Sequence, residues 1–381
     1  MSTDRLQHIE ISREAYAHNL ATFRRLLRPG CRLMAVVKAN AYGHGLEPVS
    51  HLAVEAGADV LGVNCLEEGV AIRHLGIETP VVILGYTLLG ELGTALDHRL
   101  EPVLYNIPSL ERLQAEASRR GVPAPFHLKL ETGVHRQGVM EEDLPAVIDC
   151  LRRSERLVLQ GASMHFANIE DTTDHSFARR QLDAFHLLLL RLREAGFPPR
   201  QVHAGCSAAT LLFPETHFDM VRVGISGYGL WPSKETYLAA VLLNHAPPVL
   251  QPVLTWKTRV AQIKSVPADR YIGYGCSHRT THPTTVAVLP VGYYDGYDRG
   301  LSNQGHVLVR GQRAPVLGRI CMNMIMVDVT HIPGASAEDE AVLLGAQGGE
   351  RVTAEEMAAL CHTINYEIVS RIGAHVPRVV V

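Results

Sequence analysis

The strongest constraint on the fold is an alternation that runs through the first 240 residues or so. Short apolar runs occupy residues 33–37, 59–63, 81–84, 101–105, 126–130, 157–164, 201–204 and 218–223. Between them, residues 46–56, 66–75, 108–119, 144–151 and 177–192 have apolar side chains at helical spacing. Strands that alternate with helices form parallel sheets, and eight strands are the number that a closed (β/α)8 barrel needs. We therefore expect an N-terminal barrel of the TIM type.

The pattern changes near residue 240, where helical spacing gives way to closely spaced strands. Runs rich in Val, Ile, Leu and Met occupy residues 253–266, 285–291, 306–309, 324–329 and 341–344, with Gly and Pro between them. One helix is expected over 353–362, because Thr353 followed by Glu356 fits a helix N-cap. We expect an α/β barrel domain over residues 11–241 and a mostly β C-terminal domain over 242–381, joined by the first ten or so residues. Residues 245–252 form the expected linker.

The composition limits the partners and the compartment. With 381 residues, 46% of them hydrophobic, the chain can bury one large core or two smaller ones. The formal net charge of −3 gives no basic field, so nucleic acid is not an expected partner. No signal peptide and no run of about 20 apolar residues is found, so we expect a cytoplasmic protein with no membrane partner.

The cysteines and histidines argue against a disulfide framework and against a metal site. The 7 cysteines are an odd number without a CxxC pair, and the 20 histidines show no HExxH spacing. We expect reduced thiols and no bound metal.

One lysine stands where a reactive amine is expected. Lys38 follows the apolar run 33–37 and opens residues 38–45, which are too polar and too rich in glycine to continue a strand or a helix. An amine at the mouth of a buried strand, followed by a loop that can fold around an anion, suits an enzyme that holds an aldehyde cofactor as a Schiff base. The alternative is a surface lysine at the end of a strand.

Further polar residues follow the expected strands at their carboxyl ends, which meet on one rim of a barrel. They are Lys129, Glu131 and Arg136 at the fifth strand, His165 after the sixth, Ser207 after the seventh, and Arg222, Gly224 and Ile225 at the eighth. Each could be an ordinary surface residue. So many coincidences favour a shared site on this rim.

Several segments carry a family resemblance. AVVKANAYGHG (35–45) closely resembles the pyridoxal-phosphate lysine motif of alanine racemase. Seven further segments are similar to that family and follow its order along nearly the entire chain: HLKLETGVHRQG (127–138), MHFANIED (164–171), VRVGISGYGLWPS (221–233), YIGYGC (271–276), VGYYDGYDRGLSN (291–303), GRICMNMIMVDVT (318–330) and TINYEIVSRIG (363–373).

The resemblance implies a pyridoxal 5'-phosphate enzyme that racemises L-alanine to D-alanine with two bases, supplying D-alanine for peptidoglycan. Lys38 would hold the cofactor as a Schiff base and move the α-proton on one face, and Tyr274 would act on the other. An ordinary tyrosine pKa near 10 makes a poor base, so His165 and Arg222 are the expected helpers. Family analogy places Tyr274 in the partner subunit's site, which implies a homodimer. The alternative for Tyr274 is a tyrosine of an edge strand between turn glycines.

The resemblance also implies cofactor and substrate contacts. Arg222 would face the pyridine nitrogen and, as a donor that stays charged, would leave it unprotonated; the alternative is a structural ion pair at the barrel end. The expected phosphate ligands are Tyr42, Ser207, Gly224, Ile225 and Tyr366. Arg136 would donate to the cofactor's phenolic oxygen and, with Met322 and Asn323, would meet the amino-acid substrate. Lys129 corresponds to a lysine that many relatives carbamylate.

Three departures from the family pattern bear on the substrate. Asn323 stands for an aspartate, Glu131 stands for another, and Gly205-Cys206-Ser207 stands for Ala-Asn-Ser. Asn323 removes a negative charge near the substrate, so serine or a broader range of amino acids is an alternative to alanine. Two other classes stay open: a decarboxylase of the ornithine type, and a non-catalytic pyridoxal-phosphate-binding protein.

Overall fold

The computed structural model describes residues 5–244 and 247–381, so residues 245–246 of the expected linker lie outside the described part. The described chain divides into two compact units. The first, here called the barrel unit, contains residues 15–39 and 49–251 as far as they are described. The second, here called the β unit, contains residues 5–14, 40–48 and 252–381. The domain limits 11–241 and 242–381 remain predictions.

Eight parallel strands form the barrel unit, as the sequence predicts. They are β2 (Arg32–Val36), β3 (Val60–Val63), β4 (Val81–Ile83), β5 (Leu100–Leu104), β6 (Ala124–Lys129), β7 (Leu157–Ser163), β8 (Gln201–His203) and β9 (Met220–Val223). Their order in the sheet is β8-β7-β6-β5-β4-β3-β2-β9. The two end strands meet, because Asp219 N donates to Val202 O (3.0 Å) and Arg222 N donates to Gly205 O (2.8 Å). The expected (β/α)8 fold class is confirmed.

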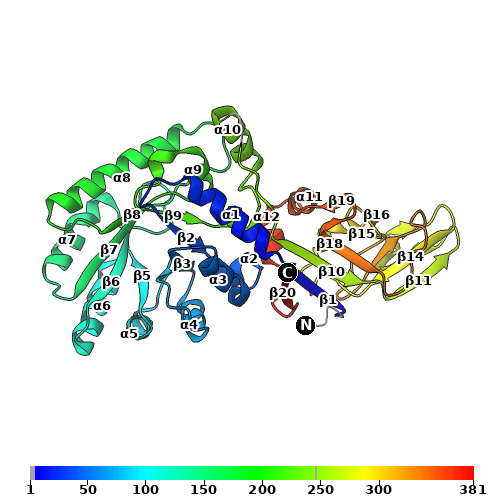
Figure 1. Ribbon diagram of the computed structural model, residues 1–381, viewed down its shortest axis with the longest axis horizontal. Helices are drawn as coiled ribbons and strands as arrows, with labels where there is room; N and C mark the ends of the chain where they lie inside the picture. Colours follow the sequence, from blue (N-terminus) through cyan, green and yellow to red (C-terminus); the bar gives the residue numbers. More distant parts are fainter. Residues whose placement is uncertain (1–4, 245–246) are drawn as a thin grey trace. The chain divides into compact units, whose positions relative to one another are not determined.

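Helices lie outside these strands (Figure 1). The α-helices are α1 (Arg13–Leu26), α2 (Lys38–Tyr42), α3 (Leu46–Glu55), α4 (Leu66–His74), α5 (Leu92–Asp97), α6 (Ile107–Arg120), α7 (Leu144–Arg152), α8 (Ser176–Glu194), α9 (Ser207–Leu212) and α10 (Lys234–Asn244). Short 3-10 helices are η1 (Leu89–Glu91), η2 (Glu141–Asp143), η3 (Pro214–Thr216) and η4 (Ile225–Tyr228). In the described part of the chain, no helix is both long and apolar enough to cross a membrane.

Helix α6 shows how local sequence sets the limits of an element. The Asn106 side chain accepts from Ser109 N (2.9 Å) and caps the start, and Gly121 ends the helix in the left-handed region at φ 70°. Between these ends, α6 buries one apolar stripe that includes Leu110 and Leu113 against the barrel.

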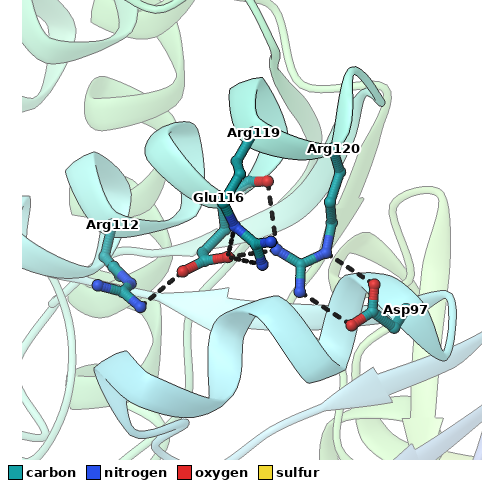
Figure 2. Close-up of polar contacts among 5 residues, drawn as sticks. All are labelled: Asp97, Arg112, Glu116, Arg119 and Arg120. Carbon is teal, nitrogen blue, oxygen red and sulfur yellow. Dashed lines mark hydrogen bonds and ion pairs between the residues drawn. The ribbon is translucent and has the colours of Figure 1, made fainter.

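Helix α6 is also tied to α5, by an ion-pair cluster around the buried Glu116. Figure 2 shows Glu116 among Arg112 (2.6 Å), Arg119 (2.9 Å) and Arg120. Arg120 also donates from Nε (2.7 Å) and Nη2 (2.9 Å) to the two carboxylate oxygens of Asp97, the last residue of α5. Such a two-bond contact fixes the geometry of both partners, so this cluster sets the spacing of the two helices.

The β unit contains three sheets. Its strands are β1 (Gln7–Ile11), β10 (Leu254–Arg259), β11 (Gln262–Val266), β12 (Tyr271–Ile272), β13 (His278–Arg279), β14 (Thr284–Leu289), β15 (His306–Val309), β16 (Gln312–Pro315), β17 (Ile325–Asp328), β18 (Glu340–Gln347), β19 (Glu350–Val352) and β20 (Arg378–Val380). The largest sheet has the order β16-β15-β18-β10-β1-β20, with β19 on β18, and the others are β11-β14-β17 and β12-β13. Its helices are α11 (Ala354–Leu360), α12 (Asn365–Ser370), η5 (Tyr274–Cys276) and η6 (Arg299–Leu301).

Two expectations for this part of the chain were wrong in detail. The run 253–266 is two strands in different sheets, because Val260 N bonds to Asp339 O (2.9 Å) while Ala261 N bonds to Val288 O (2.8 Å). A second helix, α12, follows the expected one, which begins as predicted with the Thr353 hydroxyl accepting from Glu356 N (3.1 Å).

Candidate active site

A cavity of about 550 Å³ opens within the barrel unit. It is lined by Lys38, Asn64, Leu84, Gly85, Val103, Tyr105, Lys129, Arg136, Gln137, Ser163, His165, His203 and Arg222. These residues come from the carboxyl ends of the strands or from the segments that follow them, where this fold places its sites. The lining holds two lysines and two arginines and no carboxylate, so it suits an anionic ligand.

Lys38 lies in the wall of this cavity, directly after β2. Burial lowers the pKa of its ammonium group, and the neighbouring Arg136 lowers it further, although Glu68 acts in the opposite direction. A lowered pKa raises the share of free amine, which is the form that attacks an aldehyde. The reactive position that the sequence predicts therefore has the matching electrostatics.

The segment after Lys38 is not the irregular loop that we expected. Residues 39–42 have φ between 52° and 55°, so α2 is a left-handed helical turn, which non-glycine residues rarely adopt. Asn40 holds the turn: its carbonyl accepts from Gly45 N (2.9 Å) and its side chain accepts from Leu46 N (2.8 Å). Sequence patterns describe right-handed helices, so this conformation could not be foreseen from them.

Within the β unit, the end of this turn meets the C-terminal segments. A Cβ atom on Gly43 would lie 2.0 Å from Val369 O, so only glycine fits. Arg378 donates to the carbonyl of Gly43 (2.7 Å), and also to Gly373 O (2.6 Å) at the turn after α12. In the same unit the rings of Tyr42 and Tyr366 lie 6.1 Å apart, so these two predicted phosphate ligands are neighbours.

Lys129, at the end of β6, is the second lysine of the cavity. Burial lowers its pKa to about 7, and the charges of Arg222 and Arg136 add to the effect. Its Nζ makes no hydrogen bond or ion pair with any residue that the structure describes. Near pH 7 a large share of this amine is therefore neutral and able to react.

Glu131 organises the loop that carries Arg136. One oxygen of its carboxylate accepts from the N–H groups of Thr132 (2.9 Å), Gly133 (2.7 Å) and Val134 (2.7 Å), and the other from Arg136 N (3.3 Å). Burial alone would raise the pKa of Glu131, but these backbone donors hold it low. The glutamate that departs from the family pattern thus shapes the loop.

Arg222 is held by backbone carbonyls. Its Nη1 donates to His203 O (2.8 Å), and its Nη2 donates to Met164 O and Ala204 O (both 2.9 Å). Nδ1 of His165 lies 3.4 Å from Nη2. Burial lowers the pKa of Arg222 to about 10 and, with the charge of Lys129, lowers the pKa of His165 well below its usual value. His165 is therefore a neutral imidazole beside a guanidinium.

The predicted phosphate ligands of the barrel lie together after β8 and β9. The Ser207 hydroxyl accepts from Gly224 N at 2.9 Å. Ser207 is the first residue of α9 and Ile225 is the first residue of η4. The N–H group of a first helical residue has no helical acceptor. This pair of helix starts therefore presents donors to an anion.

Tyr274, Met322 and Asn323 are not among the residues that line that cavity; they line a second hollow, of about 920 Å³, in the β unit. The side chains there are exposed, with Tyr274 at 73% and Met322 at 54%. Gly273 and Gly275 flank Tyr274 at φ 74° and 70°, conformations that glycine adopts without strain, and so direct the tyrosine outward.

The structure thus brings predicted residues together in separate groups: Lys38, Lys129, Arg136, His165 and Arg222 line the barrel cavity, Ser207 contacts Gly224, Tyr42 lies near Tyr366, and Tyr274, Met322 and Asn323 line the hollow of the β unit. The sequence did not single out three polar residues of the barrel, the half-buried Glu101 and the fully buried His127 and His203. A signal for them existed: His127 and Lys129 are two residues apart on one strand and must face the same side. His127 in this apolar strand could therefore be predicted to face the barrel interior, as Lys129 does.

The fold and the cavity define a class: a (β/α)8 barrel followed by a β-rich domain, with a lysine after the first barrel strand. Comparisons name the family. Residues 11–232 match the family "Alanine racemase, N-terminal domain", and residues 253–380 match "Alanine racemase, C-terminal domain". The chain is 42% identical to the alanine racemase of Leptospira interrogans over 377 residues, which cover 98% of this chain and 95% of that one.

Solved structures agree. The alanine racemase of the D-cycloserine-producing Streptomyces lavendulae superposes with a TM-score of 0.92 at 36% identity, covering 100% of this chain and 98% of the other. A histidine racemase from Leuconostoc mesenteroides superposes with a TM-score of 0.89 at 25% identity, covering 100% and 99%. The chain belongs to the alanine racemase family.

Proposed function

We propose that this protein interconverts L- and D-alanine with pyridoxal 5'-phosphate as cofactor. The observation that carries the proposal is the cavity of the barrel unit. Its lining contains hydrogen-bond donors and no carboxylate, and the pKa of Lys38 in its wall is lowered. The full-length similarity to alanine racemases supports alanine as the substrate. The D-alanine produced would serve peptidoglycan synthesis, and the enzyme would act in the cytoplasm.

The donor set fits this cofactor. The phosphate would meet the Ser207 hydroxyl, the N–H groups of Gly224 and Ile225, and the hydroxyls of Tyr42 and Tyr366. Arg136 would donate to the phenolic oxygen, and Arg222 would face the ring nitrogen. The bound cofactor would withdraw electrons from the α-carbon of the substrate and so make its proton acidic.

Lys38 and Tyr274 would move the α-proton. In this proposal the free amine of Lys38 takes or gives a proton on one face of the α-carbon, and the Tyr274 oxygen acts on the other. Neutral His165, whose Nδ1 faces the donor Arg222, carries its proton on Nε2 and can donate it in a hydrogen bond to the Tyr274 oxygen, which favours deprotonation of the tyrosine. Arg136 and the Met322 N–H would orient the substrate carboxylate.

We propose a homodimer in which each β unit completes the partner's site. Tyr271, Tyr274, Tyr293, Met322 and Met324 are exposed side chains that line one hollow of the β unit. Exposed apolar side chains gathered in one place mark an interaction surface, and a symmetric dimer covers two such surfaces at once. Tyr274 could then serve a cavity that its own unit does not contain.

A broader substrate range is the second candidate. Asn323 lines the same hollow as Tyr274 and carries an amide where the family pattern has an aspartate. An amide both donates and accepts, so the hydroxyl of serine would find a partner there. A relative named histidine racemase supports the view that this fold accommodates other amino acids.

The test replaces Tyr274 by Phe and leaves Lys38 in place. We expect the racemisation rate to fall by about 10²–10⁴-fold, the usual contribution of a general base, while the Lys38-dependent absorbance of the bound cofactor persists. In D₂O, one enantiomer should still exchange its α-proton. Tyr237→Phe, at an exposed tyrosine of the barrel unit, is the control. Unchanged racemisation by Tyr274→Phe would refute the two-base proposal, and a wild-type protein that binds cofactor without racemising would be a carrier.

A further inference from the structure

A row of polar side chains runs through the interior of the barrel to Arg222. The Glu101 carboxylate lies 2.8 Å from Nε2 of His127, and Nδ1 of His127 lies 2.9 Å from Nε2 of His203. Nδ1 of His203 in turn lies 2.9 Å from Nη1 of Arg222. Both histidines are fully buried, in a place where such barrels normally pack branched apolar residues.

The proton positions in this row follow from its two ends. A carboxylate only accepts, so His127 must donate from Nε2 to Glu101, and a neutral His127 then accepts at Nδ1. His203 must therefore donate from Nε2, which leaves its Nδ1 as the acceptor for Arg222. Every hydrogen bond points from Arg222 towards Glu101, and each imidazole is satisfied in one tautomer only.

The backbone makes room for this row. The pairing of β6 with β7 shifts register between Phe126 and His127, so that His127 lies opposite Gly161. A Cβ atom on Gly161 would lie 2.1 Å from Nδ1 of His127. Any residue larger than glycine would push the imidazole out of the row. The register shift in β6 and the missing side chain of Gly161 together leave space for the His127 imidazole.

The row also links Arg222 to a carboxylate. Among residues 5–244 and 247–381, no carboxylate forms an ion pair with Arg222, whose other bonds go to backbone carbonyls and to His165. A buried guanidinium usually has an anionic partner. Glu101, two imidazoles away, is the carboxylate that ends its hydrogen-bond chain.

We propose that Glu101 and His127, through His203, are positioning residues that fix the orientation of Arg222. Without the carboxylate, His127 can adopt the other tautomer, which would turn the Nδ1–H of His203 against the guanidinium and displace it. The relevance of this displacement for catalysis depends on the proposed function, in which Arg222 faces the ring nitrogen and restrains side reactions. The relevant side reaction is half-transamination, in which alanine passes its amino group to the cofactor aldehyde and leaves as pyruvate.

Four variants of the full-length protein test this proposal. Glu101→Leu removes the acceptor, whereas Glu101→Gln keeps an oxygen that can accept from His127. Gly161→Ala displaces His127 without changing a polar group. The matched control is Gly62→Ala on β3, where the added Cβ would lie 2.8 Å from the Met34 sulfur and 3.1 Å from Leu84 Cδ1, both at the flexible ends of apolar side chains.

The first measurement does not need activity. Magic-angle-spinning NMR of protein labelled with 15N-histidine distinguishes protonated from unprotonated ring nitrogens, and a His203→Asn difference spectrum assigns His203. We expect an unprotonated Nδ1 of His203 in the wild type, Glu101→Gln and Gly62→Ala, and a changed signal in Glu101→Leu and Gly161→Ala. Wild-type His203 signals in both of the latter variants would overturn the proposal.

The second measurement is pyruvate released per racemisation event. We expect this pyruvate ratio to rise about tenfold in Glu101→Leu and Gly161→Ala, because the loss of one buried hydrogen bond to a charged group has an effect of about this size. In Glu101→Gln the ratio should stay close to the wild-type value. An unchanged ratio despite altered His203 signals would also overturn the positioning role. If the wild type does not racemise alanine, the proposed function fails, while the NMR result still decides whether Glu101 and Gly161 set the tautomer of His203 that accepts from Arg222.

Discussion

Lys129 should react with carbon dioxide, and the structure sets the scale of the effect. The ordinary lysine pKa of 10.5 is lowered to about 7 by burial and by the charges of Arg222 and Arg136. At pH 8 about nine-tenths of an amine with this pKa is neutral, against about 0.3% of an ordinary lysine, a gain of about 300-fold in the reactive form. The neutral nitrogen bonds to the carbon of CO₂ and releases one proton, giving a carbamate.

This change places an anionic group in a cavity whose lining lacks carboxylates. A carbamate at Lys129 would accept hydrogen bonds from Arg136, whose side chain has no hydrogen-bond partner among the described residues. Charge-assisted hydrogen bonds of this kind contribute about 1.5–3 kcal/mol, so kcat/KM for alanine should fall by about tenfold or more when the carbamate is lost. Because protonation removes the reactive amine, the carbamate should disappear as the pH falls through about 7.

The assay is 13C NMR of the protein in 13C-bicarbonate buffer at pH 8, followed by a titration to pH 6. We expect a carbamate signal that is absent from Lys129→Gln and present in Lys234→Gln, a change at an exposed lysine of α10. Activity of the wild type should fall on removal of CO₂ and recover on its return. A wild type without the signal at pH 8, or a signal that survives in Lys129→Gln, would refute the reasoning.

Three other substitutions have expected outcomes. Asn323→Asp should lower kcat/KM for L-serine relative to L-alanine, and an unchanged ratio would count against a role in substrate choice. Arg378→Leu should reduce the free energy of unfolding by about 3 kcal/mol, measured with denaturant, because the bonds to Gly43 and Gly373 are lost; a loss within error would contradict this. Gly43→Ala should weaken cofactor binding and stability much more than Gly57→Ala, where an added Cβ meets nothing within 4 Å; equal effects would argue against the contact with Val369.

The barrel could be predicted from the sequence because its signals are local and repeated. Each of the eight expected strands is present within a few residues of its predicted position, and the helices expected over 46–56 and 108–119 end next to Gly57 and Gly121, which have φ of 82° and 70°. The spacing of apolar residues and the glycines at helix ends are local features that involve only a few neighbouring residues. A single sequence is therefore enough to predict the strands and helices from them. The placement of Lys38, Lys129 and Arg222 on one cavity followed from the strand-end rule of this fold.

The buried row behind Arg222 could not be predicted in the same way. Glu101 and His203 belong to strands that lie 100 residues apart in the chain, and their link depends on a register shift at His127. A bulge is set by the pairing of two strands, and neither strand alone signals it. The need for glycine at position 161 becomes clear only from the structure, which places the His127 imidazole opposite to it.

The conformation of the turn after Lys38 depends on residues at the other end of the chain. Four successive left-handed residues cost about 1–2 kcal/mol each. The two bonds made by Asn40 return only about 1 kcal/mol each, so the turn is not stable by itself. The two bonds from Arg378 to the carbonyl of Gly43 supply a charged donor at the end of the turn, and Gly43 can approach Val369 only because it lacks a Cβ. The conformation next to Lys38 is therefore a property of the folded β unit, which local sequence cannot specify.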